Sequence, residues 1–532
     1  MPSLREGQLN KRVRQDFGGG VNNYLGPRQV KDNESPEALD CDFKGKSGVG
    51  NREGYTQVGT VADSRTEIWG ISEYHTSSLN QLVKFASNGS NVALYYSTNG
   101  TGTWTAVTGT TFTDNTNMDV VQAISTTTSP YVGGDGTLFS FNGTDTMVKY
   151  NGSSWASHTG AATLLYGALY DNRLWGVDPT YKDTLKFSTK TPDATKPFDF
   201  TANGTSSDKG TVTFRPGSGE NIVGIKSFKN YLYVFLQNAI FRLSPASSAN
   251  TFTVELVTSA VGCVSHRSIT QVEEDLLFAG NDGIYSLGEV ANYTSIRTTN
   301  KSLRVQGIFD AFTGADKQKL VGGYHNFKYH LFYPEFGGEN TTCAVYDVRY
   351  KGWQIWTNIA AQAVVVHENT NGVSGLYFGE PSTGKVHKMY GATTDDGTAI
   401  SSSWKSASFD EANPDVLKLF MHSTFVFGDL GGSVTVKVIF DDSETSATQA
   451  ITQQKPQGGF GRDRFGRMSF GDATNTITVT RYINQPLRLK AKGKKFAVQY
   501  QITSTGQWRL DGITQTMIVF GHYKFPASLK LN

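Results

Sequence analysis

A short strand pattern recurs along the middle of the chain at intervals of 41 to 61 residues. Each copy places a turn residue before a run of small, β-branched and aromatic residues, as in Asp282-Gly-Ile-Tyr-Ser-Leu287. A period of this size, with several short strands in each repeat, is typical of a β-propeller. Because the spacing is uneven, we predict six or seven blades. The pattern is marked by Tyr95, Phe139, Phe187, Phe241, Tyr285, Tyr346 and His387.

A second strand precedes the marked strand in several repeats. It consists of a polar turn and a leucine-centred run, and the leucine lies 9 to 15 residues before the marker. Two short strands joined by a tight turn predict a hairpin within one blade. Such a blade buries its two faces only by stacking on its neighbours, so several copies are expected. The central leucines are Leu174, Leu232, Leu276 and Leu331.

The composition favours an all-β protein. The chain has 532 residues, of which 57 are glycine and 18% are charged, and no stretch shows a sustained helical apolar period. The formal net charge of +2 gives no argument for attraction to nucleic acid or to membranes. No apolar run approaches the roughly 20 residues that a membrane-spanning helix needs. The N-terminus has no apolar signal region, so we expect a soluble protein made in the cytoplasm.

The repeat is confined to the middle of the chain, which predicts three parts. Residues 1–60 show little periodicity and are expected to form a largely irregular N-terminal arm that lies against its own body or a neighbouring subunit. Residues 61–395 carry the repeat and form the propeller. Residues 396–532 change to longer alternating strands, which predict a separate C-terminal β-sandwich.

Two basic segments are the candidate contact sites. One is a small cluster near the N-terminus, and the other is a glycine-rich segment of the C-terminal part in which arginines alternate with phenylalanines. Guanidinium groups suit contacts with carboxylates, phosphates and aromatic faces, so we predict assembly contacts there. For the second segment, an exposed hairpin loop with solvated arginines is an equally good interpretation. The residues concerned are Lys11, Arg12, Arg14, Arg462, Arg464 and Arg467.

The sequence contains no complete catalytic motif. The segment from Gly379 to Val386 has the spacing of a phosphate-binding loop, but Val386 replaces the required Ser or Thr and a strand-like run follows. None of the 47 acidic residues stands out as a pair for glycoside cleavage. We therefore predict no enzyme activity, no cofactor and no metal. The three cysteines are far apart and are expected to be buried free thiols: Cys41, Cys263 and Cys343.

The first 60 residues carry a resemblance to a known group of proteins. The runs Phe17-Gly-Gly-Gly-Val-Asn22, Val30 to Phe43 and Gly50-Asn-Arg52-Glu-Gly54-Tyr55 resemble the opening of phage virion proteins. In those proteins a glycine-rich start precedes an Arg-x-Gly-Tyr or Arg-x-Gly-Phe. With its order of arm, propeller and sandwich, the chain is similar to the tail nozzle or tail hub proteins of short-tailed bacteriophages, which include packaged-DNA stabilisation proteins.

The resemblance implies a structural protein of the virion tail. It implies a hexameric ring of identical subunits below the portal and adaptor, through which DNA is retained and ejected without sequence-specific binding. The resemblance implies no catalytic residues for this chain, because the family has none. A ring of identical subunits uses contacts between unlike faces that close by rotation. A near-zero net charge suits a conduit along which DNA slides.

A second resemblance supports an alternative function. The segment Ser97-Thr-Asn99-Gly-Thr101-Gly-Thr103-Trp104 resembles the Asp-box of sialidase propellers, although Asn99 replaces the usual Asp and Thr101 the usual Gly. That box is a folding element distant from the catalytic face. The alternative is a glycan-binding or glycan-cleaving propeller, such as a receptor-binding tail component. A scaffold propeller for protein partners is a third hypothesis, disfavoured because the strands lack a Trp-Asp dipeptide.

Overall fold

The computed structural model of the protein is all-β, as the composition predicts. The helices α2 (Gln306–Asp310) and α3 (Gly314–Lys319) are only five and six residues long. No helix among the described residues is long and apolar enough to cross a membrane. The structure describes all residues except 1–8, 46, 61–64, 110, 124–135, 191–197, 202–208, 216, 246–251, 289–299, 336, 412–415, 432, 442–443, 453–482, 489–496 and 523–532.

Internal contacts divide the chain into two compact units, and each contains residues that are far apart in sequence. The pattern of the sequence alone predicts boundaries near residues 60 and 395. At the N-terminal boundary the difference arises because β7 (Gly54–Gln57) pairs with a strand of the second unit. The first unit contains residues 1–53, 350–355 and 393–532, and the second contains 54–349 and 356–392.

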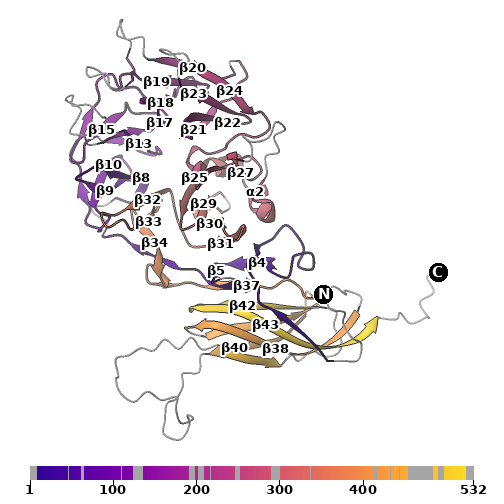
Figure 1. Ribbon diagram of the computed structural model, residues 1–532. Helices are drawn as coiled ribbons and strands as arrows, with labels where there is room; N and C mark the ends of the chain where they lie inside the picture. The colour runs from indigo at the N-terminus through magenta and orange to yellow at the C-terminus, as the bar shows by residue number, and fades with distance from the viewer. Residues whose placement is uncertain are drawn as a thin grey trace. The chain divides into compact units, whose positions relative to one another are not determined.

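Small antiparallel sheets follow one another along the second unit (Figure 1). The first two are formed by β8 (Glu67–His75), β9 (Asn80–Ser87), β10 (Asn91–Thr98), β11 (Thr105–Ala106) and β12 (Phe112–Thr113), and by β13 (Asp119–Ala123), β14 (Thr137–Phe141), β15 (Val148–Tyr150) and β16 (Trp155–Ser157). The next two are formed by β17 (Gly167–Tyr170), β18 (Arg173–Val177), β19 (Thr184–Phe187) and β20 (Gly210–Thr213), and by β21 (Ile222–Phe228), β22 (Tyr231–Leu236), β23 (Ile240–Ser244) and β24 (Thr253–Thr258).

Three further groups of strands complete the second unit. In the described part of this unit they bring the number of antiparallel groups of strands to seven, and the sixth group belongs to a longer, nine-stranded sheet. The fifth is β25 (Thr270–Val272), β26 (Asp275–Ala279) and β27 (Ile284–Ser286), the sixth is β28 (Val321–His325), β29 (Lys328–Pro334) and β30 (Asn340–Asp347), and the seventh is β32 (Ala363–Glu368), β33 (Ser374–Gly379), β34 (Val386–Ala392) and β7.

The first strands of these sheets form a closed circuit of contacts, which can be followed in Figure 1. β8 contacts β13, β13 contacts β17, and β17 contacts β21. β21 contacts the 3-10 turn η1 (His266–Ser268), which leads into β25. From there β25 contacts β28, β28 contacts β32, and β32 contacts β8 again. The seventh sheet contacts the first sheet and so closes the circuit. Its strand β7 precedes the first sheet in the sequence and pairs with β34.

The repeat predicted from the sequence matches these sheets at most positions. The four central leucines all lie in the second strand of their sheets, and each of the seven markers lies in a different sheet. One marker is out of register. Phe139 lies in β14, the second strand of its sheet, whereas Tyr150 in β15 occupies the equivalent third position. Both strands have an aromatic residue among small and branched ones, so the pattern does not separate them.

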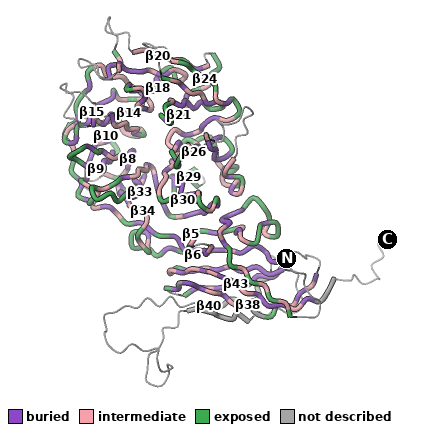
Figure 2. Tube along the Cα trace, viewed as in Figure 1, coloured by how far each residue is buried: buried purple, intermediate pink, exposed green. Residues whose placement is uncertain are grey.

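Apolar clusters lie between neighbouring sheets of the second unit. Figure 2 shows buried residues along the strands of these sheets. Trp175 and Val234 belong to the cluster between the third and fourth sheets, and both are fully buried. Tyr95 and Tyr377 belong to the cluster between the first and seventh sheets. In the described part of this unit, the first to fourth sheets and the seventh have such a cluster on both faces. The three cysteines are free and buried, as predicted: Cys41, Cys263 and Cys343.

The first unit contains two larger sheets. Phe425 and Tyr500 come from opposite sheets and pack edge to face with ring centroids 5.3 Å apart. One sheet contains β41 (Ile483–Arg488), β38 (Val416–Leu430), β43 (Trp508–His522), β6 (Gly48–Asn51) and β5 (Cys41–Lys44), with β1 (Leu9–Arg14) paired to β43. The other is the remainder of the nine-stranded sheet, formed by β31 (Gly352–Trp356), β4 (Glu37–Leu39), β37 (Ser402–Lys405), β42 (Val498–Ser504), β39 (Ser433–Phe440) and β40 (Glu444–Thr452).

The N-terminal segment is more regular than its sequence predicts. The sequence predicts a largely irregular arm, but the segment contributes β1, β4, β5 and β6 to the sheets of the first unit. A further short parallel pair joins β2 (Gly20–Val21) to β3 (Glu34–Ser35). These strands are two to six residues long. Strands this short leave no visible alternation in a sequence, which explains why they were not predicted.

Candidate functional site

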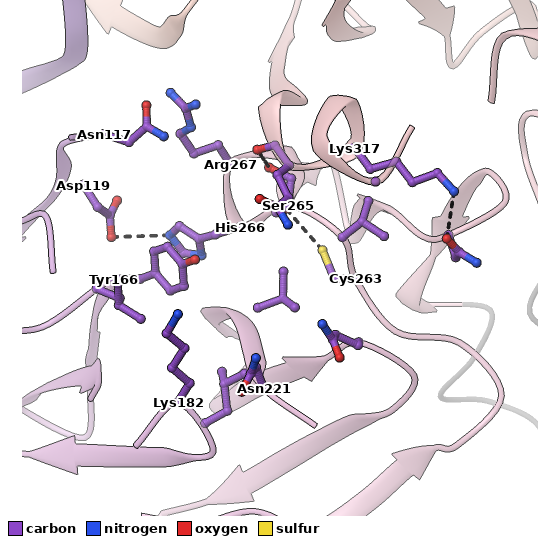
Figure 3. A pocket seen from close by; sticks show the side chains of 18 of the residues that line it. Asn117, Asp119, Tyr166, Lys182, Asn221, Cys263, Ser265, His266, Arg267 and Lys317 are labelled. Carbon is purple, nitrogen blue, oxygen red and sulfur yellow. Dashed lines mark hydrogen bonds and ion pairs between the residues drawn. The ribbon is translucent and has the colours of Figure 1, made fainter. Parts of the chain in front are cut away.

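A cavity of about 580 Å³ lies in the second unit, where the first strands of several sheets begin (Figure 3). Its lining comes from the segments that lead into β13, β17, β21 and β25, and from α3, which precedes β28. The cavity therefore lies at the end of the circuit at which these strands start. A second cavity of about 390 Å³ continues along β8, β25, β28 and β32. Met118, Asp119, His266 and Arg267 line both cavities.

Asp119 and His266 form a hydrogen-bonded pair in the cavity wall. The imidazole Nε2 lies 3.3 Å from Oδ2 of Asp119, and Nδ1 accepts from the amide of Ile225 at 3.4 Å. Because Nδ1 accepts, Nε2 carries the proton that is donated to the carboxylate. The ring of Tyr166 stacks on the imidazole with centroids 4.4 Å apart and an interplanar angle of 21°. The amide of Gly167 also donates to Oδ2 of Asp119, at 2.8 Å.

This arrangement keeps the carboxylate ionised. Burial acts to raise the pKa of Asp119, but the charge and hydrogen bond of His266 and the amide of Gly167 hold that pKa below its usual value. Burial raises the pKa of Tyr166, and the neighbouring carboxylate adds to the effect. At neutral pH Asp119 is thus a carboxylate and Tyr166 a protonated phenol.

Arg267 is shared by the three cavities on this side of the second unit. Its Nη1 donates to the carbonyl oxygen of Gln362 at 2.6 Å. Burial lowers the pKa of Arg267 to about 10, so the guanidinium is still charged at neutral pH. Two lysines, Lys182 and Lys317, belong to the same lining, and the latter donates to Oδ1 of Asn281 at 2.8 Å (Figure 3).

The chemistry of these groups suits binding better than group transfer. Cys263 is fully buried, its Sγ donates to the carbonyl of Ser265 at 3.2 Å, and burial raises its pKa to about 12. A thiol of that kind is a poor nucleophile. Among the described residues of the larger cavity, Asp119 supplies the one carboxylate, whereas glycoside hydrolysis by paired carboxylates needs two. No group of three metal-ligating side chains occurs in the described part of the chain.

The sequence does not indicate that these residues form one site, because Asp119, Tyr166 and Arg267 come from different repeats. Asp119 opens β13, Tyr166 directly precedes β17, and Arg267 lies in η1 ahead of β25. No short motif connects positions so far apart. The one usable signal is their shared place at the start of a first strand. Alignment of the repeats on their first strands, rather than on their aromatic third strands, would have brought them together.

The predicted contact residues of the N-terminal segment lie on β1, which pairs with β43. Arg12 Nε lies 3.1 Å from Glu411 Oε2, and Arg14 Nη2 lies 2.7 Å from Oε1 of the same carboxylate. The guanidinium of Arg14 also lies 3.7 Å from the ring centroid of Phe409. Both arginines are thus bound within the first unit, whereas Lys11 is exposed. The other predicted contact residues lie outside the described residues: Arg462, Arg464 and Arg467.

The residues of the phage-like N-terminal runs have specific roles in the first unit. Arg52 Nε donates to Asp40 at 2.6 Å, and its two Nη atoms donate to the carboxylate of Asp395 at 2.8 and 2.5 Å. All three side chains are buried. Burial acts to lower the pKa of Arg52, but the two carboxylates raise it overall. Phe17 is also buried and packs edge-on against Trp404, with centroids 5.4 Å apart.

Two further residues of these runs are restricted by their surroundings. Gly20 has a φ of +74°, and a Cβ there would lie 2.6 Å from the carbonyl oxygen of Trp353. Only glycine fits a position with both restrictions. The side-chain amide of Asn22 is buried and donates to Oε2 of Glu34 at 2.8 Å.

The two partial motifs of the second unit are structural elements. Ser97 Oγ accepts from the amide of Gly102 at 3.0 Å, and Trp104 Nε1 donates to the carbonyl of Val58 at 2.9 Å. The Asp-box-like segment therefore fixes the turn after β10 and holds the chain that continues from β7. The segment that resembles a phosphate-binding loop connects β33 to β34, and Val386 begins β34 rather than a helix.

No protein-family model and no curated protein matches the chain. Among solved structures, it is similar to the AfRom2 CNH domain (9% identity, 63% of this chain and 99% of that chain, TM-score 0.37). It is also similar to YCF48 bound to D1 peptide (10% identity, 64% of this chain and 94% of that chain, TM-score 0.37). A third similar structure is the Neurospora crassa Pan2 WD40 domain (6% identity, 64% of this chain and 96% of that chain, TM-score 0.35). Likenesses at this level carry no argument about activity or partners.

Proposed function

We propose that this chain is a structural protein of a bacteriophage tail, which forms the nozzle or hub ring below the portal and adaptor. The observation that carries the proposal is the role of the N-terminal runs. Arg52 lies between two buried carboxylates, and Gly20 has a conformation and a close contact that exclude other residues. The resemblance to phage proteins therefore rests on residues with strict structural requirements and not on a glycine-rich composition.

We further propose that the second unit is a seven-bladed β-propeller and that the first unit is a β-sandwich. The closed circuit of first strands and the inter-sheet clusters support the propeller. The strand β7 would serve as the closing strand of the last blade. The two sheets that meet through Phe425 and Tyr500 support the sandwich.

The outer face of β1 is the proposed contact with a neighbouring subunit. Exposed and partly buried residues alternate along this strand, and Leu9 and Val13 are 64% and 58% exposed on the same face as Lys11. One edge of β1 pairs with β43, and no strand in the described part of the chain pairs with its other edge. An edge strand with an apolar face is suited to a contact with another chain. In a hexameric ring, this face would meet a different surface of the next subunit.

The mass of the assembled protein tests the proposal. Full-length protein, and tails isolated from virions that contain it, should give ring-shaped particles of six copies by mass measurement and electron microscopy. DNA passing through the ring should bind without sequence preference. A strictly monomeric protein that is absent from tails would overturn the proposal.

A pair of substitutions tests the contact face. The double variant Leu9→Asp, Val13→Asp should remain folded, because both side chains are exposed, but should lose ring formation. The matched control is Val254→Asp, Leu256→Asp on β24, where the side chains are 41% and 52% exposed. If both double variants assemble like the unmodified protein, β1 is not the contact.

A glycan-binding receptor protein is the second candidate function. One observation favours it: the cavity of about 580 Å³ combines the ring of Tyr166 with amide side chains such as Asn117 and Asn221 (Figure 3). Aromatic rings and amides suit sugar faces and hydroxyl groups. A glycan array together with a hydrolysis assay separates the two candidates, since turnover of a specific sugar would favour the receptor function.

A further inference from the structure

The larger cavity has an excess of positive charge. Among its described lining residues, Lys182, Arg267 and Lys317 are cationic, whereas Asp119 is the one carboxylate. That carboxylate already accepts from His266 and from the amide of Gly167. The described lining thus carries three cationic side chains against one carboxylate, and this excess of positive charge favours the binding of an anion.

Arg267 is the residue whose hydrogen bonds are least complete. A guanidinium has five N–H donors. Here Nη1 donates to the carbonyl of Gln362, and no group in the described part of the chain accepts from Nε or Nη2. The side chain is partly buried in the wall shared by three cavities, so its remaining donors face space that solvent or a ligand must fill. Carboxylates and phosphates match such a guanidinium best, because they accept two parallel hydrogen bonds.

The surrounding side chains indicate the rest of the ligand. Asn117 and Asn221 are labelled around the cavity in Figure 3, and Gln237 and Gln318 also line it. Amide groups donate and accept, and so they suit hydroxyl groups better than further charges. The volume of about 580 Å³ is within the range of small-molecule sites.

We propose that this cavity binds a small anion carried on a hydroxyl-rich body, a phosphorylated or carboxylated sugar, with Arg267 contacting the anionic group. Lys182 and Lys317 add attraction at the rim. The Asp119–His266 pair and the stacked Tyr166 line the same cavity beside Arg267. This inference does not depend on the tail function, and it specifies a ligand class that the glycan alternative leaves open.

Calorimetric titration of the full-length protein tests the proposal with three probes: D-glucose 6-phosphate, D-glucuronate and uncharged D-glucose. At least one of the two anions should bind, and glucose should bind about tenfold more weakly or not at all, since it lacks the charge-assisted hydrogen bonds. Binding of only one anion identifies the group as phosphate or as carboxylate.

Substitutions assign the binding to the cavity. Arg267→Gln should weaken the anion by about tenfold to a hundredfold, the range expected for lost hydrogen bonds to a charged group. Lys182→Gln should weaken it less, and this exposed side chain can be changed without risk to the fold. The control is Arg242→Gln, because that guanidinium pairs with Glu255 on neighbouring strands and does not line the cavity.

Three results would overturn the proposal. The first is no binding of either anion at concentrations up to about 10 mM, weaker than a specific small-molecule site. The second is equal binding of glucose, which would leave the glycan alternative standing but remove the anion. The third concerns the two variants together. The proposal fails if Lys182→Gln binds the anion as tightly as the unmodified protein and Arg267→Gln either also binds it as tightly or does not fold.

Discussion

Several basic side chains of this protein are buried, and each lies beside aromatic rings or carboxylates. Lys84 Nζ lies 4.5 Å from the ring centroid of Trp104, and Lys328 Nζ lies 5.4 Å from that of Trp356. Arg52 instead contacts two carboxylates. Ring faces and carboxylates offset part of the free energy lost when a cation leaves water. Loss of such a neighbour is therefore more costly here than at the surface.

Arg52→Met should destabilise the first unit strongly. The substitution leaves Asp40 and Asp395 buried without their shared cation, which typically costs about 3 to 5 kcal/mol. Urea denaturation measures the free energy of unfolding. The control is Arg509→Met, whose partner Asp511 is partly exposed and whose pair is worth about 0 to 1 kcal/mol. Equal losses in the two variants would contradict the role assigned to Arg52.

His330 should make the protein less stable in acid. Burial, with a contribution from Lys328, lowers the pKa of His330 from 6.5 to about 3. As the pH falls below 6.5, His330 binds a proton in the unfolded chain but stays neutral in the folded protein. The free energy of unfolding should then decrease by up to about 1.4 kcal/mol per pH unit until the folded-state pKa is reached.

The pH dependence of denaturation checks this expectation. Between pH 7 and about pH 4, the slope of stability against pH should be smaller in His330→Gln than in the unmodified protein. Slopes rather than absolute stabilities are compared, because the substitution itself disturbs a buried site. Parallel slopes would show that His330 does not carry the effect.

At the scale of elements, the pairing of β7 with β34 joins the two ends of the second unit. Gln57 lies opposite His387, and Tyr55 lies opposite Met389. The pairing continues beyond the strand, since the amide of Val58 donates to the carbonyl of Val386 at 2.8 Å. A strand supplied from a distant part of the sequence closes the circuit by hydrogen bonds and packing rather than by a covalent connection.

Val58→Pro should open the seventh sheet. Proline lacks the amide that donates to Val386, and the loss of one hydrogen bond at a buried carbonyl costs about 1 to 3 kcal/mol. The control Val58→Ala shortens the same side chain but keeps the amide. Hydrogen exchange should be faster in β33 and β34 for the proline variant than for the alanine variant. Identical exchange in the two variants would mean that β7 does not hold the sheet.

At the scale of the whole molecule, the core of the second unit is divided among its successive sheets. The second unit has separate clusters between successive sheets, and its circuit of first strands returns to its start. A sheet in a closed circuit has two packed neighbours, so it cannot separate without exposing two clusters. We therefore expect the sheets of this unit to unfold together, whereas an open row of repeats could unravel from one end.

Trp175→Ala tests this cooperativity. The side chain is fully buried between the third and fourth sheets, and truncation of a buried tryptophan costs about 3 to 5 kcal/mol. Native-state hydrogen exchange should show a similar loss of protection in β9, in the first sheet, as in β18 and β22. A loss confined to the third and fourth sheets would contradict a closed, cooperative circuit.

Much of the architecture was predictable because it depends on local patterns that repeat. The leucines of the second strands were assigned correctly, since a polar turn and an apolar run are visible in any single copy. The register error at Phe139 arose where two adjacent strands share the same pattern. The sequence predicts an irregular arm for a related reason: its strands are too short to show alternation, and the partner of β1 is about five hundred residues away.

The sequence alone determined that the chain is all-β, that its middle is built from hairpin repeats, and that its cysteines are free, because these properties follow from composition and from residues close together in the chain. Only the tertiary structure decided that Arg12 and Arg14 bind Glu411, and that His266 and Arg267 lie in one wall with Asp119. Such groups are brought together by the circuit of sheets and by long-range strand pairing. No local pattern records a partner that is more than a hundred residues away.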